Sequence, residues 1–408
     1  MGLMRIAAVP KSVITVARSF VAAALFGYFF DLLQQTQNRL LNAVGRPFGD
    51  DWVNYWSAGY LALHGRAAEI YDLNVFHAFQ ETIVGSPLDG YHYSYPPVLL
   101  LLTAPFALIP YVPALFVWLS ASWYAFYRAL KLAMPGRGVL LLALAAPAVL
   151  INAVGGQNGC WTAALLGGGL SLLERRPYLA GSLFGMMIYK PQLGLLIPVA
   201  LIAGRQWRAI AAASVTASVL LLASLLWFGT DVWAEYLRNL NLLRQTILED
   251  GAGVWHRFVS VFVAARRLGA PVEVAYVTQA LVGALACVAV AWVWLRETRA
   301  NIKNAVLLLG TCLATPYLQD YDLVFGAMVV AWLWQQPVET YASERALQIA
   351  CGLFLILPLV AAVLAQLTGF AFGPLFILPL FIVALQMSFG ARGAAVSASS
   401  SRLSSAQP

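Results

Sequence analysis

Long runs of apolar residues, separated by short polar segments, make up most of this 408-residue chain. The runs have about 15–25 residues, the length at which an α-helix crosses the hydrocarbon core of a bilayer. The pattern predicts an all-α, polytopic membrane protein with about 10–12 transmembrane segments, in which residues 1–390 form a single integral membrane domain. The predicted apolar segments are 12–33, 97–109, 112–130, 138–153, 157–173, 178–203, 207–228, 272–295, 304–316, 322–334, 346–366 and 372–388.

Two of these segments do not fit a single straight crossing. Segment 97–109 is short and precedes the span 112–130, so we expect it to be re-entrant or broken. Segment 178–203 has basic residues at both ends and "YKPQ" at 189–192 in its middle. Proline interrupts helical hydrogen bonding, and non-helical backbone at membrane depth is tolerated where it lines a polar cavity. We predict two half-helices that meet at this motif; a single tilted span is the alternative.

Lysine and arginine positions orient the predicted spans, because basic residues accumulate on the cytoplasmic side. The first span is interpreted as retained, because no A-x-A-like signal-peptidase site precedes the polar stretch after it. Both termini are then cytoplasmic, and a long first loop at 34–94 and a second at 229–257 lie outside. The tail 391–408 is small, polar and basic, which predicts disorder. Most of the unusual polar residues thereby fall on one side, which predicts a single extracytoplasmic cavity.

Composition supports a membrane protein and argues against other classes. The chain is 61% hydrophobic and 11% charged, against about 25% charged in soluble domains. The net charge of +7 does not indicate nucleic-acid binding, because the basic residues stand singly or in pairs at the ends of apolar runs. The four cysteines have no metal-ligand or disulfide spacing, and we find no Gly-rich phosphate loop or Ser nucleophile elbow. We therefore expect no tightly bound transition metal, no cofactor and no direct use of a cytosolic nucleotide. Asp50 and Asp51 could share a divalent ion as easily as a proton, so metal dependence stays open.

The acidic pair Asp50–Asp51 has two interpretations. The next residues carry Val53, Trp56 and Tyr60 at helical spacing, which predicts an amphipathic helix in the membrane interface. An aspartate at its start would cap free backbone N–H groups, and spacing alone favours this role. Alternatively, one aspartate is a general base at the membrane surface.

Lys190 is a functional-site candidate because a cation within an apolar segment is costly. A phosphate would suit a lysine that acts as a point charge, and snorkelling to the interface is the alternative. Further candidates are polar or aromatic residues beside predicted spans. Gln157 and Asn158 form either a polar helix entrance or ligands of a sugar, and Trp255 and His256 either contact a sugar or lie in the interface without a role. Asp320 and Asp322 stand where the chain returns to the membrane.

Several motifs, in this order and spacing, resemble glycosyltransferase family 87. They are "DWVNYWSAG" (51–59), "GRAAEIYD" (65–72), "YSYPPVLLLLTAPFALIP" (93–110) and the segment 156–209 with its Gly-Gln turn and embedded Lys-Pro. The resemblance covers roughly residues 10–335. It implies the glycosyltransferase C fold, a polyprenyl-phosphate sugar donor, a lipid or glycan acceptor, and a plasma-membrane enzyme of the cell envelope with its active site on the extracytoplasmic side.

The resemblance also implies roles for particular residues. The family has a catalytic aspartate in a D-x-x-x-Y pattern, which Asp51 and Tyr55 match, with Asp50 as the alternate. The substrate-binding candidates become Lys190, Gln157, Asn158, Tyr55, Tyr95, Trp255, His256, Arg257, Asp320 and Asp322. An aspartate that acts as a base near pH 7 needs its pKa raised by desolvation or by a neighbouring carboxylate.

The resemblance implies a hexosyltransferase, with mannose or a similar hexose or pentose as the sugar. The later loop "TPYLQDYD" (315–322) lacks a histidine that is common in the family. The main alternative is a transporter or flippase of a lipid-linked sugar. That class is usually built from two half-sites on inverted repeats, which this sequence does not display. A non-catalytic scaffold of an envelope complex would have no use for the acidic pair or Lys190.

Overall fold

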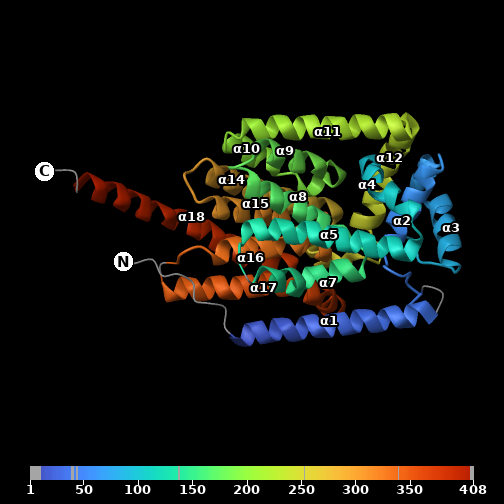
Figure 1. Ribbon diagram of the computed structural model, residues 1–408, viewed down its shortest axis with the longest axis horizontal. Coiled ribbons are helices and arrows are strands. Elements are labelled where there is room, and N and C mark those ends of the chain that lie inside the picture. Colours follow the sequence, from blue (N-terminus) through green and yellow to red (C-terminus); the bar gives the residue numbers. More distant parts are fainter. Residues whose placement is uncertain are drawn as a thin grey trace.

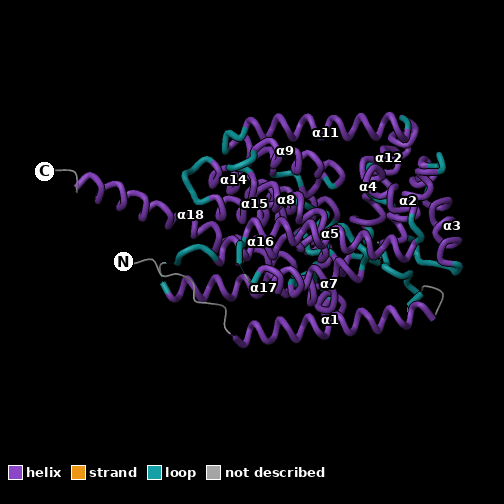
Figure 2. The backbone as a smooth tube through the Cα atoms, in the orientation of Figure 1, coloured by secondary structure: helices purple, strands orange, loops and turns teal. Residues whose placement is uncertain are grey.

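The computed structural model describes residues 11–37, 41–42, 45–136, 138–251, 253–338 and 340–404. Within these ranges the chain is helical, with isolated β-bridges at Leu41–Pro47 and Phe258–Gln319 as its β pairing (Figures 1 and 2). The helices lie side by side along the long axis of the molecule (Figure 1). This architecture confirms the prediction of an all-α fold.

Four helices of the described chain are long and apolar enough to cross a bilayer: α1 (Lys11–Gln37), α11 (Trp207–Phe228), α14 (Val272–Trp294) and α17 (Tyr341–Thr368). Shorter or more mixed helices pack among them. They are α5 (Tyr111–Ala133), α6 (Val139–Ala145), α7 (Pro147–Val154), α8 (Gly159–Leu172), α13 (Val261–Arg267), α15 (Ala300–Ala314), α16 (Gly326–Trp334) and α18 (Gly373–Ser404). The protein is therefore a polytopic helical membrane protein.

The segment 178–203 forms a re-entrant pair of half-helices, as predicted. Helix α9 (Pro177–Met186) runs parallel to α11, because Gly181 faces the carbonyl of Ala209 and Gly185 faces that of Ala213. The chain leaves helical geometry at Lys190 (φ −140°, ψ 63°), where the following proline disfavours the α conformation. Helix α10 (Ile197–Ala203) then returns to the level at which α9 began, since only a short turn separates it from Trp207.

The segment after the first loop is also broken. It consists of η2 (Pro97–Leu99), α4 (Leu100–Thr103) and η3 (Ala104–Leu108), which precede α5. Proline in η2 and η3 limits each piece to one or two turns. These pieces pack against α2 at one end of the bundle, so this segment is the broken piece that the sequence predicts.

The first loop folds into a layer that covers one end of the bundle. It contains α2 (Trp52–Leu63), η1 (Ala67–Tyr71) and α3 (Leu73–Val84), and α12 (Thr230–Leu243) of the second loop lies close by (Figure 1). The prediction of an interfacial α2 is wrong, because most of its residues are buried on all sides. Gly59 permits this packing: a Cβ there would lie 2.8 Å from the carbonyl oxygen of Thr103.

The C-terminal segment differs from the sequence-based prediction. The sequence predicts disorder over 391–408, whereas α18 continues to Ser404 and residues 405–408 lie outside the described part. The segment contains several alanines, which have the highest helix propensity, and no Gly or Pro stands between Gly393 and Ser404 to interrupt the helix.

Candidate active site

Polar residues from distant parts of the sequence meet at the end of the bundle that α2 and α3 cover. They come from the turn before α2, α2 itself, the corner at Tyr95, the α7–α8 turn, the break between η4 (Met187–Tyr189) and η5 (Pro191–Leu193), η7 (Trp255–Arg257) and η8 (Asp320–Phe325). Among the sequence-predicted candidates, this cluster contains Asp50, Asp51, Tyr55, Tyr95, Gln157, Asn158, Lys190, Arg257, Asp320 and Asp322.

Asp51 occupies the N-cap position of α2, but its side chain makes no capping hydrogen bond. Instead its Oδ2 accepts a hydrogen bond from the Nε2 of Gln157, and its Oδ1 accepts one from Asn54 at 3.3 Å. The Nη1 of Arg257 lies 3.7 Å from the same Oδ2. The capping role that spacing alone favours is therefore wrong for Asp51. Its carboxylate faces the polar cluster.

The environment of Asp51 raises the pKa of its carboxyl group to about 7. Loss of contact with water is the largest cause, the neighbouring charge of Asp50 is the second, and Arg257 and Arg46 oppose both. The pKa is thereby brought close to neutral pH, the range in which a carboxylate is an effective general base. The sequence analysis expects the pKa of a catalytic aspartate to be raised by desolvation or by a neighbouring carboxylate, and both causes act on Asp51.

Asp50 is held in an unusual backbone conformation, with φ at +47°. This left-handed region is uncommon for residues other than glycine. The Oδ1 of Asp50 accepts a hydrogen bond from the Tyr91 hydroxyl at 2.6 Å, and Arg46 lies 3.2 Å from Oδ2. Arg257 is 3.7 Å from that oxygen. Both carboxylates of the acidic pair therefore converge on the guanidinium of Arg257.

The turn between α7 and α8 brings Gln157 to Asp51. Gly156 has φ +57°, and a Cβ at this position would clash with the carbonyl oxygen of Gly49. Only glycine fits both the backbone angle and the close approach. The "GGQN" motif is thus a turn, as one interpretation predicted, and this turn places two amide side chains in the cluster.

The hydroxyl of Tyr55 joins the amide side chains to a group of tyrosines. It donates to the Oε1 of Gln157 at 3.0 Å and accepts from the Nδ2 of Asn158 at 3.1 Å. The hydroxyl of Tyr95 lies 2.9 Å away, and that of Tyr321 lies 3.5 Å beyond it. This network fixes the position of Gln157, which in turn holds Asp51.

Lys190 and Asp322 form a buried ion pair, with side chains 2% exposed and an Nζ–Oδ1 distance of 2.5 Å. Lys190 also donates to the Oδ1 of Asn158 at 3.0 Å, and its Nζ lies 4.6 Å from the ring centre of Tyr321. The second carboxylate oxygen of Asp322 accepts the backbone N–H of Gln319. The charge of Lys190 is therefore compensated within the protein.

Arg257 is the central cation of the acidic side of the cluster. Besides the acidic pair, it contacts Asp320, whose Oδ1 lies 3.3 Å from its Nη2. Its guanidinium carbon also lies 5.6 Å from the ring centre of Tyr321. The Arg257 side chain is 14% exposed, so it faces a cavity while its position is set by three carboxylates.

Four sequence-based candidates do not line the cavities of this cluster: Asn158 and Asp320, which hold the lining residues Lys190 and Arg257, and Trp255 and His256. The indole N–H of Trp255 donates to the carbonyl of Leu248, and its ring stacks with Arg266. Trp255 thereby packs against a small apolar cluster around Phe258 and Phe262. His256 is also absent from the lining of the cavities, so only Arg257 of this three-residue helix reaches them.

Two adjoining cavities open beside these residues. The first, of about 500 Å³, is lined by Asp50, Asp51, Tyr55, Gln157 and Arg257 among others. The second, of about 350 Å³, is lined by Lys190, Asp322, Arg244 and neighbouring polar residues. They share a wall formed by Ser94, Tyr95, Ile247, Gln319 and Tyr321. Carboxylates outnumber basic side chains in the first lining, whereas basic side chains outnumber carboxylates in the second.

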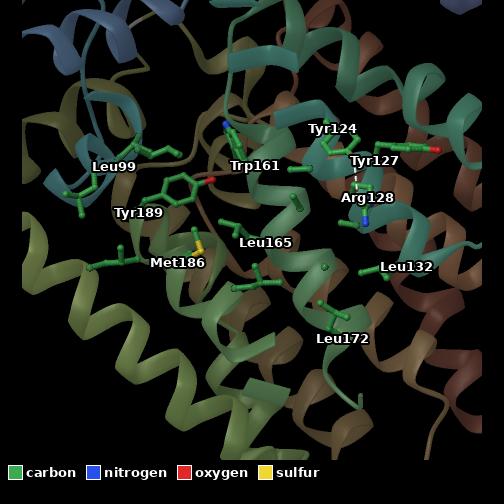
Figure 3. A pocket seen from close by; sticks show the side chains of 18 of the residues that line it. Leu99, Tyr124, Tyr127, Arg128, Leu132, Trp161, Leu165, Leu172, Met186 and Tyr189 are labelled. Atoms are coloured by element: carbon green, nitrogen blue, oxygen red, sulfur yellow. Dashed lines mark hydrogen bonds between the residues drawn. The ribbon is translucent and has the colours of Figure 1, made fainter. Parts of the chain in front are cut away.

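An apolar groove of about 950 Å³ leads away from the second cavity, since Tyr189 lines both. Figure 3 shows its side chains converging from α5, α8 and α9, with Leu99 and Tyr189 on one side and Arg128 and Leu132 on the other. Most of its lining is leucine, methionine or an aromatic residue, so it suits a hydrocarbon chain. Gly168 lies along the groove and leaves it open, because it has no side chain.

Sequence reasoning did not find several residues of the site. Arg46 and Tyr91 hold Asp50, and Asn54 contacts Asp51. Arg46 and Tyr91 stand in no quoted motif, and Asn54 belongs to the motif "DWVNYWSAG" without being singled out in it, so only the fold shows these contacts. In the described residues, no group of three or more His, Cys, Asp and Glu side chains is arranged to hold a metal ion.

An aspartate with a raised pKa in a polar cavity, held by amide side chains and arginine, has the features of an enzyme's active site. The sequence comparison identifies the group: the chain belongs to glycosyltransferase family 87, whose profile matches residues 93–316. The chain is therefore a membrane glycosyltransferase, which decides against the transporter alternative.

Curated relatives are similar over part of the chain. Two proteins named "Alpha-(1->3)-arabinofuranosyltransferase", from Mycobacterium tuberculosis strains CDC 1551 / Oshkosh and ATCC 25618 / H37Rv, are 31% identical over 149 residues. The match covers 33% of this chain and 34% of each relative, so the chain matches about a third of their length. No solved structure matches this chain significantly.

Proposed function

We propose that this glycosyltransferase moves a sugar from a polyprenyl-phosphate donor to a hydroxyl group of a lipid or glycan acceptor, with Asp51 as general base. The observation that carries the proposal is the position of Asp51. It lies in a polar cavity with its pKa raised to about 7, and this cavity shares a wall with a second, basic cavity. Two adjoining cavities of opposite charge preference suit two substrates that react with each other.

The acceptor hydroxyl occupies the first cavity in this mechanism. The Asp51 carboxylate takes the hydroxyl proton while the acceptor oxygen forms a bond to the anomeric carbon of the donor sugar. The bond between that carbon and the phosphate oxygen breaks, and its electron pair leaves with the polyprenyl phosphate. Gln157 and Asn54 hold Asp51 in place, and an orienting shell of this kind is what a general base requires.

The departing phosphate occupies the second cavity, beside the Lys190–Asp322 pair. The cations there stabilise the negative charge that develops on the leaving group. The polyprenyl chain lies in the apolar groove, which adjoins this cavity at Tyr189. Each methylene group buried there contributes about 0.8 kcal/mol to binding.

The transferred sugar is proposed to be a pentose such as arabinofuranose, because the printed names of the curated relatives describe arabinofuranosyltransferases. Mannose, which the family resemblance suggests, is the second candidate. Both fit the first cavity by size, so the donor assay has to distinguish them.

The active site is proposed to face the extracytoplasmic side of the plasma membrane. The basic residues at Arg175, Arg176 and Arg208 lie beside the starts of α9 and α11, the end of the bundle opposite α12 (Figure 1). By the positive-inside rule that end is cytoplasmic, and the cavities then open outside. The domain assignment, one membrane domain over 1–390, forms part of the same proposal.

The test is a transfer assay with purified protein in lipid nanodiscs and radiolabelled polyprenyl-phosphate arabinofuranose or mannose. Asp51→Asn should lower kcat by about 10²–10⁴ while its melting temperature stays close to that of wild type. Asp51→Glu should retain part of the activity. Asp231→Asn, on the exposed first turn of α12, is the matched control and should behave as wild type. Wild-type turnover by Asp51→Asn would remove Asp51 from the mechanism.

A further inference from the structure

The charges that line the second cavity do not balance. Its lining contains two basic side chains, Lys190 and Arg244, and one carboxylate, Asp322. Lys190 and Asp322 neutralise each other at 2.5 Å, and Asn158 takes another of the ammonium hydrogens. Among the residues that line this cavity, Arg244 therefore adds one net positive charge, because its own ion-pair partner, Glu249, lies outside the lining.

Arg244 is held only weakly in its present position. It begins the π-helical segment Arg244–Glu249, and such segments often occur at functional sites. Its Nε lies 3.4 Å from the Oε1 of Glu249, whose carboxylate also accepts a hydrogen bond from Tyr276 at 2.8 Å. The Arg244 side chain is 52% exposed and that of Glu249 is 15% exposed, so solvent on the arginine side screens the pair, and its contribution is about 1 kcal/mol. The guanidinium can therefore leave Glu249 at little cost.

We propose that Arg244 binds the phosphate of the lipid-linked substrate, between its own guanidinium and the Lys190–Asp322 pair. This inference rests on the proposed donor class and adds the residue that recognises its charged group. A polyprenyl-phosphate sugar is a phosphodiester with one negative charge, which matches the single surplus charge of the cavity. The planar guanidinium can bind two phosphate oxygens at once, whereas Lys190 is already committed to Asp322.

The position of Arg244 fits the geometry of the whole substrate. A phosphate in this cavity adjoins both the apolar groove, at Tyr189, and the Asp51 cavity, at Tyr95 and Tyr321. The polyprenyl chain and the sugar are attached to opposite ends of the phosphate. One placement therefore directs the hydrocarbon into the groove and the anomeric carbon toward Asp51.

The test measures binding of three probes to the full-length protein in nanodiscs: polyprenyl monophosphate, the uncharged polyprenol, and inorganic phosphate. Arg244→Ala should weaken polyprenyl monophosphate binding by about 10- to 100-fold and leave polyprenol binding unchanged. Arg244→Lys should recover part of the loss. Arg238→Ala is the matched control, since Arg238 lies on the adjoining helix α12, is 69% exposed and lines neither cavity.

The outcomes separate this inference from the proposed function. If wild type binds polyprenyl monophosphate no more tightly than polyprenol, the donor class fails and the inference fails with it. If wild type does discriminate and Arg244→Ala discriminates equally well, only the role of Arg244 is overturned. Inorganic phosphate should bind more weakly than the lipid phosphate; tighter binding would contradict a lipid-linked ligand. Unchanged melting temperatures show that the variants are folded.

Discussion

The charge of Asp50 should set the pH at which the enzyme becomes active. In the proposed mechanism, only the ionised form of Asp51 accepts the acceptor proton. Activity should therefore rise with pH through a midpoint near 7, the pKa of that carboxyl group. Asp50 raises this pKa, so the substitution Asp50→Asn should lower the midpoint while preserving the shape of the side chain.

The expected shift follows from the distances. The Oδ2 atoms of both carboxylates lie 3.7 Å from the same Nη1 of Arg257, so they are no farther apart than twice that distance. At about 7 Å and an effective dielectric constant of about 20, two unit charges interact by about 2.4 kcal/mol. The two side chains are 15% and 28% exposed. Solvent screening reduces the interaction to about 1 kcal/mol, or somewhat less than one pH unit.

The assay is the rate of sugar transfer, kcat/KM, measured between pH 5 and pH 9 for wild type and Asp50→Asn in nanodiscs. The wild-type midpoint should lie near 7 and the variant midpoint about 0.7 unit lower. Below these values both proteins lose activity, because Asp51 is protonated and cannot act as a base. The variant should therefore exceed wild type in relative activity at mildly acidic pH.

Asp89→Asn is the control, because Asp89 lines the same cavity but is not among the charges that shift the pKa of Asp51. Its midpoint should equal that of wild type. An unchanged midpoint in Asp50→Asn would refute the electrostatic coupling of the acidic pair. A midpoint that moves upward would show that Asp50 stabilises the ionised form of Asp51, which is the opposite of the repulsion expected between two like charges.

Three further variants test the parts around the acidic pair. Lys190→Ala leaves the buried carboxylate of Asp322 unpaired and should destabilise the fold by about 3–5 kcal/mol. The double variant Lys190→Met/Asp322→Leu removes both charges, so it should recover the melting temperature of wild type but not the sugar-transfer activity. Tyr55→Phe removes the hydroxyl that holds Gln157, and the unpaired amide should lower the free energy of unfolding by about 1–3 kcal/mol. The substitution should lower kcat more than it changes KM, and activity equal to that of wild type would exclude a positioning role for Tyr55. Gly168→Phe fills the apolar groove and should raise KM for long-chain donors but not for short-chain analogues; equal effects on both would place the chain elsewhere.

The sequence predicted the break at Lys190 and the meeting of distant polar residues because both follow from strong local rules. A proline disfavours helical backbone at the residue before it, and a lysine within an apolar segment needs a polar environment. The positive-inside rule then placed the remaining polar residues at the same end, and the structure brings Asp51, Gln157 and Lys190 together there.

The sequence could not predict features that depend on packing between distant segments. Its apolar spacing suggested an interfacial α2, but the pattern does not reveal that α4, η3 and the rest of the first loop cover the other face of this helix. Trp255 and Arg257 are equally prominent in sequence, and only the fold turns the indole into an apolar cluster and the guanidinium toward Asp320. Arg244 has no motif, and its significance follows only from the charges around it.

The central claim is that the two adjoining cavities form one site that opens on the extracytoplasmic side and binds the lipid phosphate. Ser94 is exposed and lines both cavities, whereas Glu174 is exposed beyond the far end of α8. The direct measurement is labelling of Ser94→Cys and Glu174→Cys with a membrane-impermeant maleimide in right-side-out and inside-out vesicles. We predict that Ser94→Cys reacts only in right-side-out vesicles and is protected by polyprenyl monophosphate, while Glu174→Cys reacts only in inside-out vesicles. Labelling of Ser94→Cys from the cytoplasmic side, or labelling that polyprenyl monophosphate does not slow, would contradict the account.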